Sequence, residues 1–303
     1  MNFIPLILAL GIAPFMVGLI NRVKAIFGGR QGQPLLQPYY DIWKLLHKGA
    51  VYSRTTSWVF RAGPIVTLAG VLVATALMPL GSCPSLISFS GDLILFAYLL
   101  ALGRFFTVAA ALDTGSPFEG MGASREVFFS TLAEPALLLG LAAVAKKAIG
   151  TPLISLTEIH QHVTPELWAG SGLILVFVAI AFLLVYLAEN SRIPVDDPNT
   201  HLELTMIHEV MVLDHSGPDF AFILYGAALK LWVLGALIVG MVVPNTGYMV
   251  IDLATSLVGM FVLAVLVGVI ESVMGRLRLL RVSQLLVGAT ALSVLALVLE
   301  YRG

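Results

Sequence analysis

Apolar residues fill eight long stretches of this chain, and shorter polar connections separate them. Each stretch is about 18–25 residues long, the length that a helix needs to cross the hydrocarbon core of a bilayer. The stretches cover approximately 2–20, 63–80, 92–112, 124–145, 168–188, 219–243, 249–271 and 282–300. The pattern predicts an all-α membrane protein with about eight transmembrane helices, forming a single membrane domain over residues 1–303.

A short amphipathic helix is predicted between the first two stretches, after a Gly- and Pro-containing run that breaks helical structure. Four residues recur at helical spacing on one face: Tyr39, Ile42, Trp43 and Leu46. Charged residues fall on the other side: Asp41, Lys44 and Lys48. The pattern is typical of an interfacial helix with aromatic rings at headgroup depth. Such a helix is either a plain lipid anchor or a partner contact, and the preceding Gly/Pro/Gln run favours the partner contact.

Composition agrees with a membrane protein, since 58% of the residues are hydrophobic and only 12% are charged. Soluble domains contain about 25% charged residues. The formal net charge of -1 argues against a nucleic-acid partner. Met1-Asn2-Phe3 has no positive charge and no cleavage site follows it, so the first stretch is expected to be a retained helix rather than a signal peptide.

Basic residues concentrate in the connections on one side of the predicted membrane. The segment 21–62 contains seven of them: Arg22, Lys24, Arg30, Lys44, Lys48, Arg54 and Arg61. The stretch 272–281 adds Arg276, Arg278 and Arg281. Because positive connections stay in the cytoplasm, we expect both termini outside and the loops 21–62, 113–123 and 189–218 in the cytoplasm.

The single cysteine, Cys83, lies in a short Gly-Ser-Cys-Pro loop. One cysteine forms no intrachain disulfide, and an iron–sulfur cluster normally takes four ligands that are mostly cysteines. We therefore expect an inert thiol and no redox cofactor in this chain. Any redox centre that the protein serves is expected on another subunit.

Three ionisable residues, Arg104, Glu134 and Lys230, lie roughly halfway along predicted membrane helices. A charge at that depth costs about 2.5–3.5 kcal/mol even on lenient insertion scales. Such residues face the protein interior or a water-filled cavity, and they commonly mark an ion or proton path. Glu134 precedes Pro135, which frees a backbone carbonyl in the preceding turn and favours a hydrated pocket. A simple hydrogen bond to a neighbouring helix is the structural alternative.

The connection after the fifth stretch carries a second group of candidates. Two prolines break the helix after Glu189, and Thr200 with Glu203 reads as a capping box that starts a new helix. Four polar residues share one face of that predicted helix: His201, Thr205, His208 and Glu209. Their spacing is loose for a metal, so no metal site is predicted. A relay or buried polar network is favoured over a solvated face.

The polar connections resemble one family, the proton-translocating membrane subunit shared by respiratory complex I (its H subunit) and membrane-bound nickel–iron hydrogenases (formate hydrogenlyase subunit 4). The first matching set is Gly32, Gln37, Asp41, Lys44 and Leu45. The second is Asp113 to Phe118, Gly122, Ala123, Arg125, Glu126 and Glu134. The third is Glu189, Arg192, Pro194, Asp196 and Glu203. The resemblance covers nearly the whole chain.

Within that family, the motifs are more similar to the hydrogenase branch. Complex I members carry a Gly-Pro-Asn-Arg-Val-Gly-Pro run where this chain has only Gly32-Gln33-Pro34. They also carry a Glu-Gly-Glu-Ser-Glu string where this chain has Asn199-Thr200-His201-Leu202-Glu203, which keeps only the last acid. This departure argues against a quinone chamber of the complex I type.

The resemblance implies a membrane-arm subunit of an energy-converting oxidoreductase in the inner membrane, without catalytic residues of its own. The implied proton path is Glu126, Glu134, Glu189, Glu203, Glu209, His201 and His208, with Arg104 and Lys230 biasing the pKa values. The implied docking residues are Arg30, Gln37, Asp41, Lys44, Asp113, Arg125, Arg192 and Asp196. Implied partners are the large and small hydrogenase-like subunits, which carry the iron–sulfur clusters and the nickel–iron centre, antiporter-like membrane subunits, and membrane lipid. The quinone-chamber subunit of complex I and a stand-alone ion or organic-anion transporter are the alternatives.

Overall fold

The fold was analysed in a computed structural model, which describes residues 3–149, 155–196 and 206–302. Eight of its helices are long and apolar enough to cross a membrane, as the sequence predicted. They are α1 (Ile4–Phe27), α3 (Trp58–Leu77), α4 (Asp92–Asp113), α5 (Pro117–Ile149), α7 (Pro165–Glu189), α8 (Gly217–Val242), α9 (Met249–Val273) and α10 (Leu279–Arg302). The shorter helices are α2 (Gln37–Leu46), α6 (Leu156–His162) and the 3₁₀ helix η1 (Glu209–Val212).

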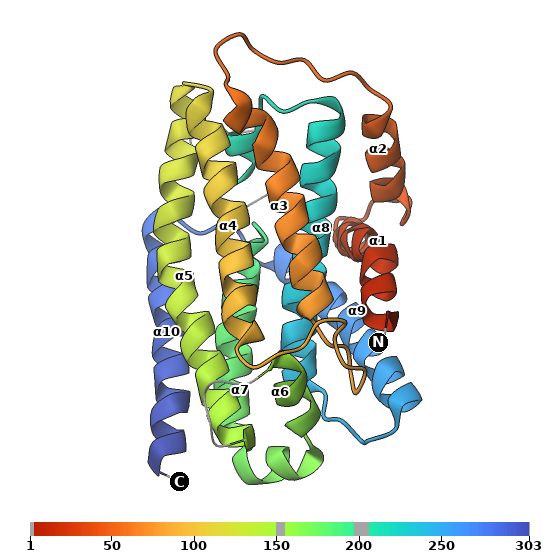
Figure 1. Ribbon diagram of the computed structural model, residues 1–303, viewed down its shortest axis with the longest axis vertical. Coiled ribbons are helices and arrows are strands. Elements are labelled where there is room, and N and C mark those ends of the chain that lie inside the picture. The colour runs from red at the N-terminus through yellow and green to blue at the C-terminus, as the bar shows by residue number, and fades with distance from the viewer. Residues whose placement is uncertain (1–2, 150–154, 197–205, 303) are drawn as a thin grey trace.

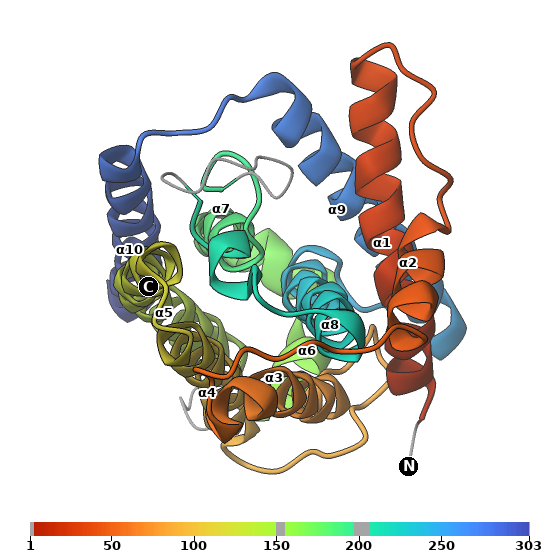
Figure 2. The ribbon, with the colours of Figure 1, turned by 90° about the horizontal axis from the view of Figure 1, so that it is seen from above.

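The long helices form a bundle in which α7 and α8 are enclosed by the others (Figure 2). Nearly all of the second half of α8 is buried, from Ala228 to Met241. Small residues let neighbouring backbones approach, as expected for helices that pack within a bilayer. A Cβ at Gly63 would lie 2.9 Å from Ala110 Cβ, which brings α3 against α4. A Cβ at Gly268 would lie 2.7 Å from Val23 Cβ, which brings α1 against α9.

The connections divide between the two ends of the bundle (Figure 1). The long connection between α1 and α3 arches over one end, which also holds the α4–α5 turn. The opposite end holds α6, and it is called the α6 end below. Both termini lie in the half of the picture that contains α6, as expected for an even number of crossings.

Helix α2 is the predicted amphipathic helix, although it begins at Gln37, two residues earlier than the pattern indicated. Its apolar face lines a groove against Pro14 of α1 and Tyr225 of α8. All four residues predicted for the apolar face line this groove: Tyr39, Ile42, Trp43 and Leu46. The Tyr39 hydroxyl donates a hydrogen bond to the Gly11 carbonyl and so attaches α2 to α1.

Two connections differ from the sequence-based expectation. Helix α5 begins at Pro117, inside the predicted loop 113–123, so only residues 114–116 remain as a turn. Proline is well suited to the first position of a helix, because its missing N–H would have no helical partner there. Gly115 makes the preceding turn tight, since it has the positive φ of +71° that other residues avoid.

The prediction of an α-helix running through His208 and Glu209 is wrong. The proposed capping box at Thr200 and Glu203 lies outside the described residues, but residues 206–208 are irregular and η1 has only four residues. The Asp196 carboxylate accepts hydrogen bonds from the backbone N–H groups of Ile207 (3.0 Å) and His208 (3.1 Å). Side-chain acceptors of this kind compete with the helical hydrogen bonds of the same N–H groups.

Candidate functional site

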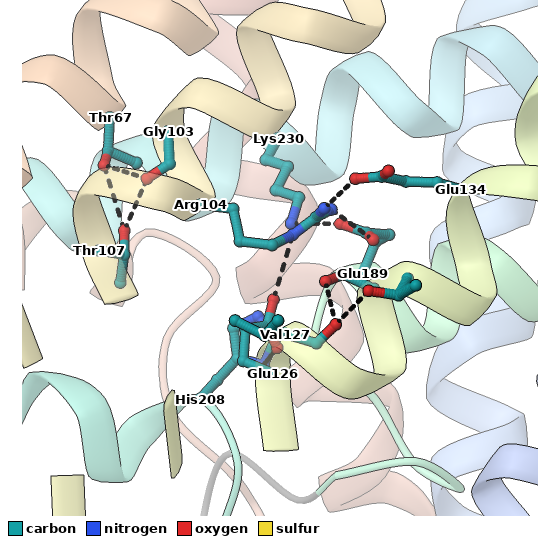
Figure 3. A network of polar contacts seen from close by, with 12 residues as sticks. Thr67, Gly103, Arg104, Thr107, Glu126, Val127, Glu134, Glu189, His208 and Lys230 are labelled. Carbon is teal, nitrogen blue, oxygen red and sulfur yellow. Dashed lines mark hydrogen bonds and ion pairs between the residues drawn. The ribbon is translucent and has the colours of Figure 1, made fainter. Parts of the chain in front are cut away.

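Arg104 of α4 lies at the centre of a cluster of charged side chains (Figure 3). Its guanidinium contacts three carboxylates at once. Nη1 lies 2.5 Å from Glu134 Oε1, Nη2 lies 2.6 Å from Glu189 Oε1, and Nε lies 3.5 Å from Glu126 Oε1. The planar fork of an arginine, with five N–H donors, suits such simultaneous contact with several carboxylates.

Two further side chains complete this group, which is called the Arg104 cluster below. Lys230 Nζ of α8 lies 2.8 Å from Glu189 Oε2, so Glu189 is shared by two cations. His208 Nδ1 lies 3.2 Å from Glu126 Oε2. Among the described residues, the cluster comprises Arg104, Glu126, Glu134, Glu189, His208 and Lys230. Side chains from α4, α5, α7 and α8, and from the segment before η1, therefore meet at one point.

Burial differs within the Arg104 cluster. The Glu189 side chain is 9% exposed and Glu126 is 6% exposed, whereas Glu134 is 48% exposed at the edge of the cluster. Buried charges persist only with compensating charges or hydrogen bonds, because desolvation is costly. Three carboxylates against Arg104 and Lys230 give a formal charge of -1 among the described residues, with His208 counted as neutral. A proton can neutralise that excess charge, so the arrangement is suited to proton uptake.

Helix geometry explains why α5 supplies two of the carboxylates. Glu126 and Glu134 are eight residues apart, and helical residues at that spacing lie on one face. This face of α5 lies against Arg104 of α4, which contacts both carboxylates. His208 is placed from the other side, through the Asp196 carboxylate that accepts its backbone N–H. Asp196 is itself buried and pairs with Arg276 at 2.9 Å.

Six of the nine residues predicted for a proton path thus meet in the Arg104 cluster. Glu209 is the first residue of η1 and is half-buried there. His201 and Glu203 lie outside the described residues. Arg104 and Lys230 form ion pairs with these carboxylates. Their influence on the pKa values of the carboxylates, and proton transfer by the cluster, stay predictions.

The predicted docking residues occupy two environments. Arg30, Asp41 and Lys44 are exposed, and the Gln37 amide donates a hydrogen bond to Asp41 at 2.8 Å along the surface of α2. The others engage groups of the chain itself. Asp113 accepts from the Ser57 N–H at 2.6 Å, and Arg125 donates to the Met206 carbonyl at 3.0 Å.

A second buried charge group, which the sequence reasoning missed, surrounds Glu271 near the end of α9. The Glu271 side chain is 0% exposed, and it lies 2.8 Å from Lys24 Nζ and 3.4 Å from Arg192 Nη1. Arg192, a predicted docking residue, is therefore buried inside the bundle. Glu271 closes an apolar run, so the sequence presented it as a boundary residue. The sequence did contain a hint of this pair. Glu271 and Lys24 both stand where an apolar run ends on the predicted cytoplasmic side, so an acid and a base were available at the same level of the membrane.

Buried polar groups at the α6 end have a different kind of partner. Asp92 accepts from the Leu156 N–H at 2.7 Å and from the Ser155 hydroxyl at 2.8 Å. His160 is buried with Nδ1 3.0 Å from the Leu156 carbonyl, and burial lowers the pKa of this histidine, although contacts with backbone carbonyls oppose the shift. These groups hold α6 in place against α4 and α8.

A metal site is not evident in the part of the chain that the structure describes, where no group of three or more His, Cys, Asp or Glu residues could hold an ion. Cys83 is a free, buried thiol whose pKa is raised by burial and by the nearby Asp252. A raised thiol pKa lowers the thiolate fraction and hence the reactivity.

Comparison with protein families matches residues 1–301 to the family described as NADH dehydrogenase. This chain belongs to that family. The match spans all eight membrane helices, so the Arg104 cluster and the buried charges around Glu271 both lie inside the family domain.

Among similar proteins, formate hydrogenlyase subunit 4 of Escherichia coli is 34% identical over 286 residues, covering 91% of each chain. Hydrogenase-4 component C of the same organism is 30% identical, covering 98% of this chain and 94% of the relative. The H subunit of NADH-quinone oxidoreductase from Anaplasma phagocytophilum is 28% identical, covering 74% of this chain and 70% of the relative. The chain is therefore a multi-pass membrane subunit related to components of hydrogenases and of complex I.

The fold also matches a solved structure. A chain of the membrane-bound sulfane sulfur reductase, an archaeal respiratory membrane complex, superposes with a TM-score of 0.82 at 23% sequence identity. The superposition covers 97% of this chain and 96% of that one. It supports the eight-helix arrangement as a shared fold.

Proposed function

We propose that this chain is the membrane-arm subunit of an energy-converting oxidoreductase of the hydrogenase type. In this proposal it anchors a hydrophilic redox arm and couples the reaction of that arm to the movement of protons or other ions. The observation that carries the proposal is the Arg104 cluster. Ionisable residues from four membrane helices meet there, and such residues at membrane depth mark ion or proton paths.

The cluster suits a coupling role because its charge is unbalanced by one unit. A change in charge or hydration at the docking face would alter the proton affinity of the carboxylates, since nearby charges shift pKa values within a poorly hydrated site. Glu189 ends α7, and the turn that follows it faces the proposed docking side. In this proposal, a change in charge at the docking face therefore alters the proton affinity of Glu189 before that of the other carboxylates. Glu126 and Glu134 then offer the next carboxylates, both held by Arg104.

The redox chemistry is assigned to partner subunits in this proposal. The single buried cysteine supplies no ligand set for an iron–sulfur cluster, and the iron–sulfur clusters and the nickel–iron centre are placed on the large and small subunits of the arm. The exposed residues Arg30, Asp41 and Lys44 supply part of the docking face. Glu134 stays half exposed at membrane depth, and we assign the antiporter-like membrane partner to that side because an uncovered charge there is costly.

The quinone-chamber subunit of complex I is the second candidate. Relatives from NADH-quinone oxidoreductases are similar to this chain, but the 34% identity to formate hydrogenlyase subunit 4 extends over more of the chain. Purification through a tag on this chain in mild detergent separates the candidates. Co-purification of nickel and iron–sulfur subunits is expected, whereas a flavin-containing NADH dehydrogenase arm would favour complex I. A chain that purifies alone would favour a stand-alone transporter.

Orientation belongs to the same proposal, with both termini outside and the basic connections in the cytoplasm of an inner membrane. A cysteine introduced at Ser53, which is exposed, should react with a membrane-impermeant maleimide only from the cytoplasmic side. Cys83 makes a suitable background because it is buried. Labelling of intact cells from outside would reverse the orientation and remove the docking face from the cytoplasm.

A further inference from the structure

Lys24, Arg192 and Glu271 form a second buried ion group, called the Glu271 cluster below. They come from α1, from the turn after α7, and from α9. The close approach of α1 to α9 at Gly268 brings Lys24 within 2.8 Å of Glu271. Arg192 is fixed by its backbone N–H, which donates to the Leu187 carbonyl at 2.8 Å. The proposed coupling path makes no use of this group.

The Glu271 cluster and the Arg104 cluster meet at the end of α7. Tyr186 and Glu189 are three residues apart within the helix and are therefore neighbours, and Arg192 lies in the turn that follows Glu189. Glu189 belongs to the Arg104 cluster and Arg192 to the Glu271 cluster. The Tyr186 hydroxyl is buried without a hydrogen-bond partner among the described residues, and it interacts electrostatically with both Arg192 and Glu271.

The two clusters carry opposite formal charges. The Arg104 cluster has three carboxylates against one arginine and one lysine, a formal charge of -1 with His208 counted as neutral. The Glu271 cluster has two cations and one carboxylate, a charge of +1. The Asp196–Arg276 pair on the outer side of the same turn is neutral. Charges in a poorly hydrated interior are weakly screened, so each cluster acts on the proton affinity of the other.

We propose that the Glu271 cluster is a charge-setting group that tunes the proton affinity of Glu189 across the end of α7. The proposal rests on the proposed function, since it assigns Glu189 to a proton path. Lys24, Arg192 and Glu271 act through their net charge and do not themselves carry the proton. The net charge of +1 favours the ionised form of Glu189. Without the negative charge of Glu271, the cluster would carry +2 and would favour that form more strongly.

The test measures ion translocation per redox turnover as a function of pH, in vesicles that contain the complete complex. Glu271→Gln raises the charge of its cluster to +2, which should shift the midpoint of the pH profile to lower pH. Lys24→Gln lowers that charge to zero and should shift the midpoint to higher pH. For a change of one unit charge in a weakly screened interior, shifts on the order of half a pH unit to one unit are expected.

The double variant Lys24→Gln with Glu271→Gln is the decisive control. It removes one charge of each sign, leaves the cluster at +1, and should return the midpoint to that of the native complex. A purely structural ion pair also recovers stability when both partners are removed, but it predicts no opposite shifts of the midpoint in the two single variants. Tyr186→Phe removes the buried hydroxyl without altering the charge and should leave the midpoint in place.

A matched control lies at the opposite end of the bundle, where Lys147 pairs with Glu300 at 3.1 Å. Glu300→Gln removes a carboxylate that is 10% exposed from an ion pair, and it should not move the pH midpoint. If Glu271→Gln prevents assembly, Lys24→Gln still tests the sign, because Lys24 is 21% exposed and tolerates substitution more readily.

Unshifted profiles, or shifts of the same sign in both single variants, would overturn the charge-setting role. The proposed function is tested separately by Glu189→Gln in the same vesicles. If Glu189→Gln keeps normal ion translocation, the proton path itself fails. If it abolishes translocation while the Lys24 and Glu271 variants keep the native midpoint, only the tuning role fails.

Discussion

Buried carboxylates occur at both ends of this membrane domain, but their partners differ in kind. Glu189 contacts two cations from different helices, whereas Asp92 accepts from a backbone N–H and a hydroxyl of one short segment. The first arrangement brings unbalanced charge together, and the second satisfies one carboxylate where a chain segment docks. The difference separates groups suited to exchanging protons from groups that hold the fold. Burial alone does not make this distinction, since Asp92 is the more deeply buried residue.

The largest effect that tests this comparison is expected from Arg104→Met. Removing one partner of a buried ion pair costs about 3–5 kcal/mol, because the remaining charges stay buried. Here three carboxylates lose their shared cation, so the assembled complex should be lost or strongly reduced on native gels. Arg104→Lys keeps the charge without the fork and should recover part of the assembly. Normal assembly and thermal stability in Arg104→Met would show that the cluster is hydrated and loosely held.

A smaller effect is expected from Glu134→Gln, which keeps the shape and removes the charge. Glu134 is half exposed and pairs with Arg104 alone among the described ion pairs, so the complex should assemble normally. Ion translocation per turnover should fall several-fold, as measured with a pH-sensitive dye inside vesicles. Glu166→Gln, at an exposed position in the first turn of α7, serves as the control. Unchanged coupling in Glu134→Gln would make Glu134 structural only.

The opposite outcome is expected at the α6 end. Asp92→Asn retains one acceptor oxygen but loses a charge-assisted hydrogen bond at the start of α6. The free energy of unfolding should fall by about 1–3 kcal/mol, visible as a lower midpoint of thermal unfolding in detergent. Ion translocation per turnover should be unchanged in the complexes that remain folded. A lowered coupling ratio would place Asp92 on the ion path and end the contrast between the two regions.

The smallest expected effect is on the pH dependence of stability, through His160 at the α6 end. Burial lowers the pKa of His160 below its usual 6.5, so the folded protein holds this ring neutral. Its contribution to stability is therefore complete above the unfolded pKa and decreases as the pH falls below it. The loss is at most about 1.4 kcal/mol per pH unit for one proton. His160→Asn should flatten the decline of thermal stability between pH 6.5 and 5; an identical decline in both proteins would assign it to other groups.

The sequence predicted the eight membrane helices because length and apolarity alone define a crossing. It also identified Arg104, Glu134 and Lys230, since a charge inside an apolar run is visible without a structure. It did not show that Glu189 is the residue that joins Arg104 to Lys230. Which helices are neighbours depends on side-chain packing, and helix–helix contacts such as that between Gly268 and Val23 leave no simple periodic signal.

Residues at the ends of apolar runs were the hardest to interpret. Glu271 looked like an interfacial acid and Lys24 like a topology signal, because neither is surrounded by apolar residues on both sides. Only the packing of α1 on α9 reveals that they pair away from solvent. The sequence pattern also wrongly predicted a helix at His208. The Asp196 carboxylate, which is distant in sequence, accepts hydrogen bonds from the backbone N–H groups of Ile207 and His208.

If the Arg104 cluster couples a redox reaction to ion movement, Glu189→Gln should uncouple the two in vesicles that contain the complete complex. Gln keeps the shape of the side chain and removes the charge that Arg104 and Lys230 share. The measurement is the number of ions moved per turnover, with the redox rate followed in the same sample and Glu300→Gln as the matched control. Glu189→Gln complexes are expected to assemble and to turn over with an artificial electron donor while ion movement is lost. A native ratio of ions to turnovers in Glu189→Gln would contradict the coupling role of the Arg104 cluster.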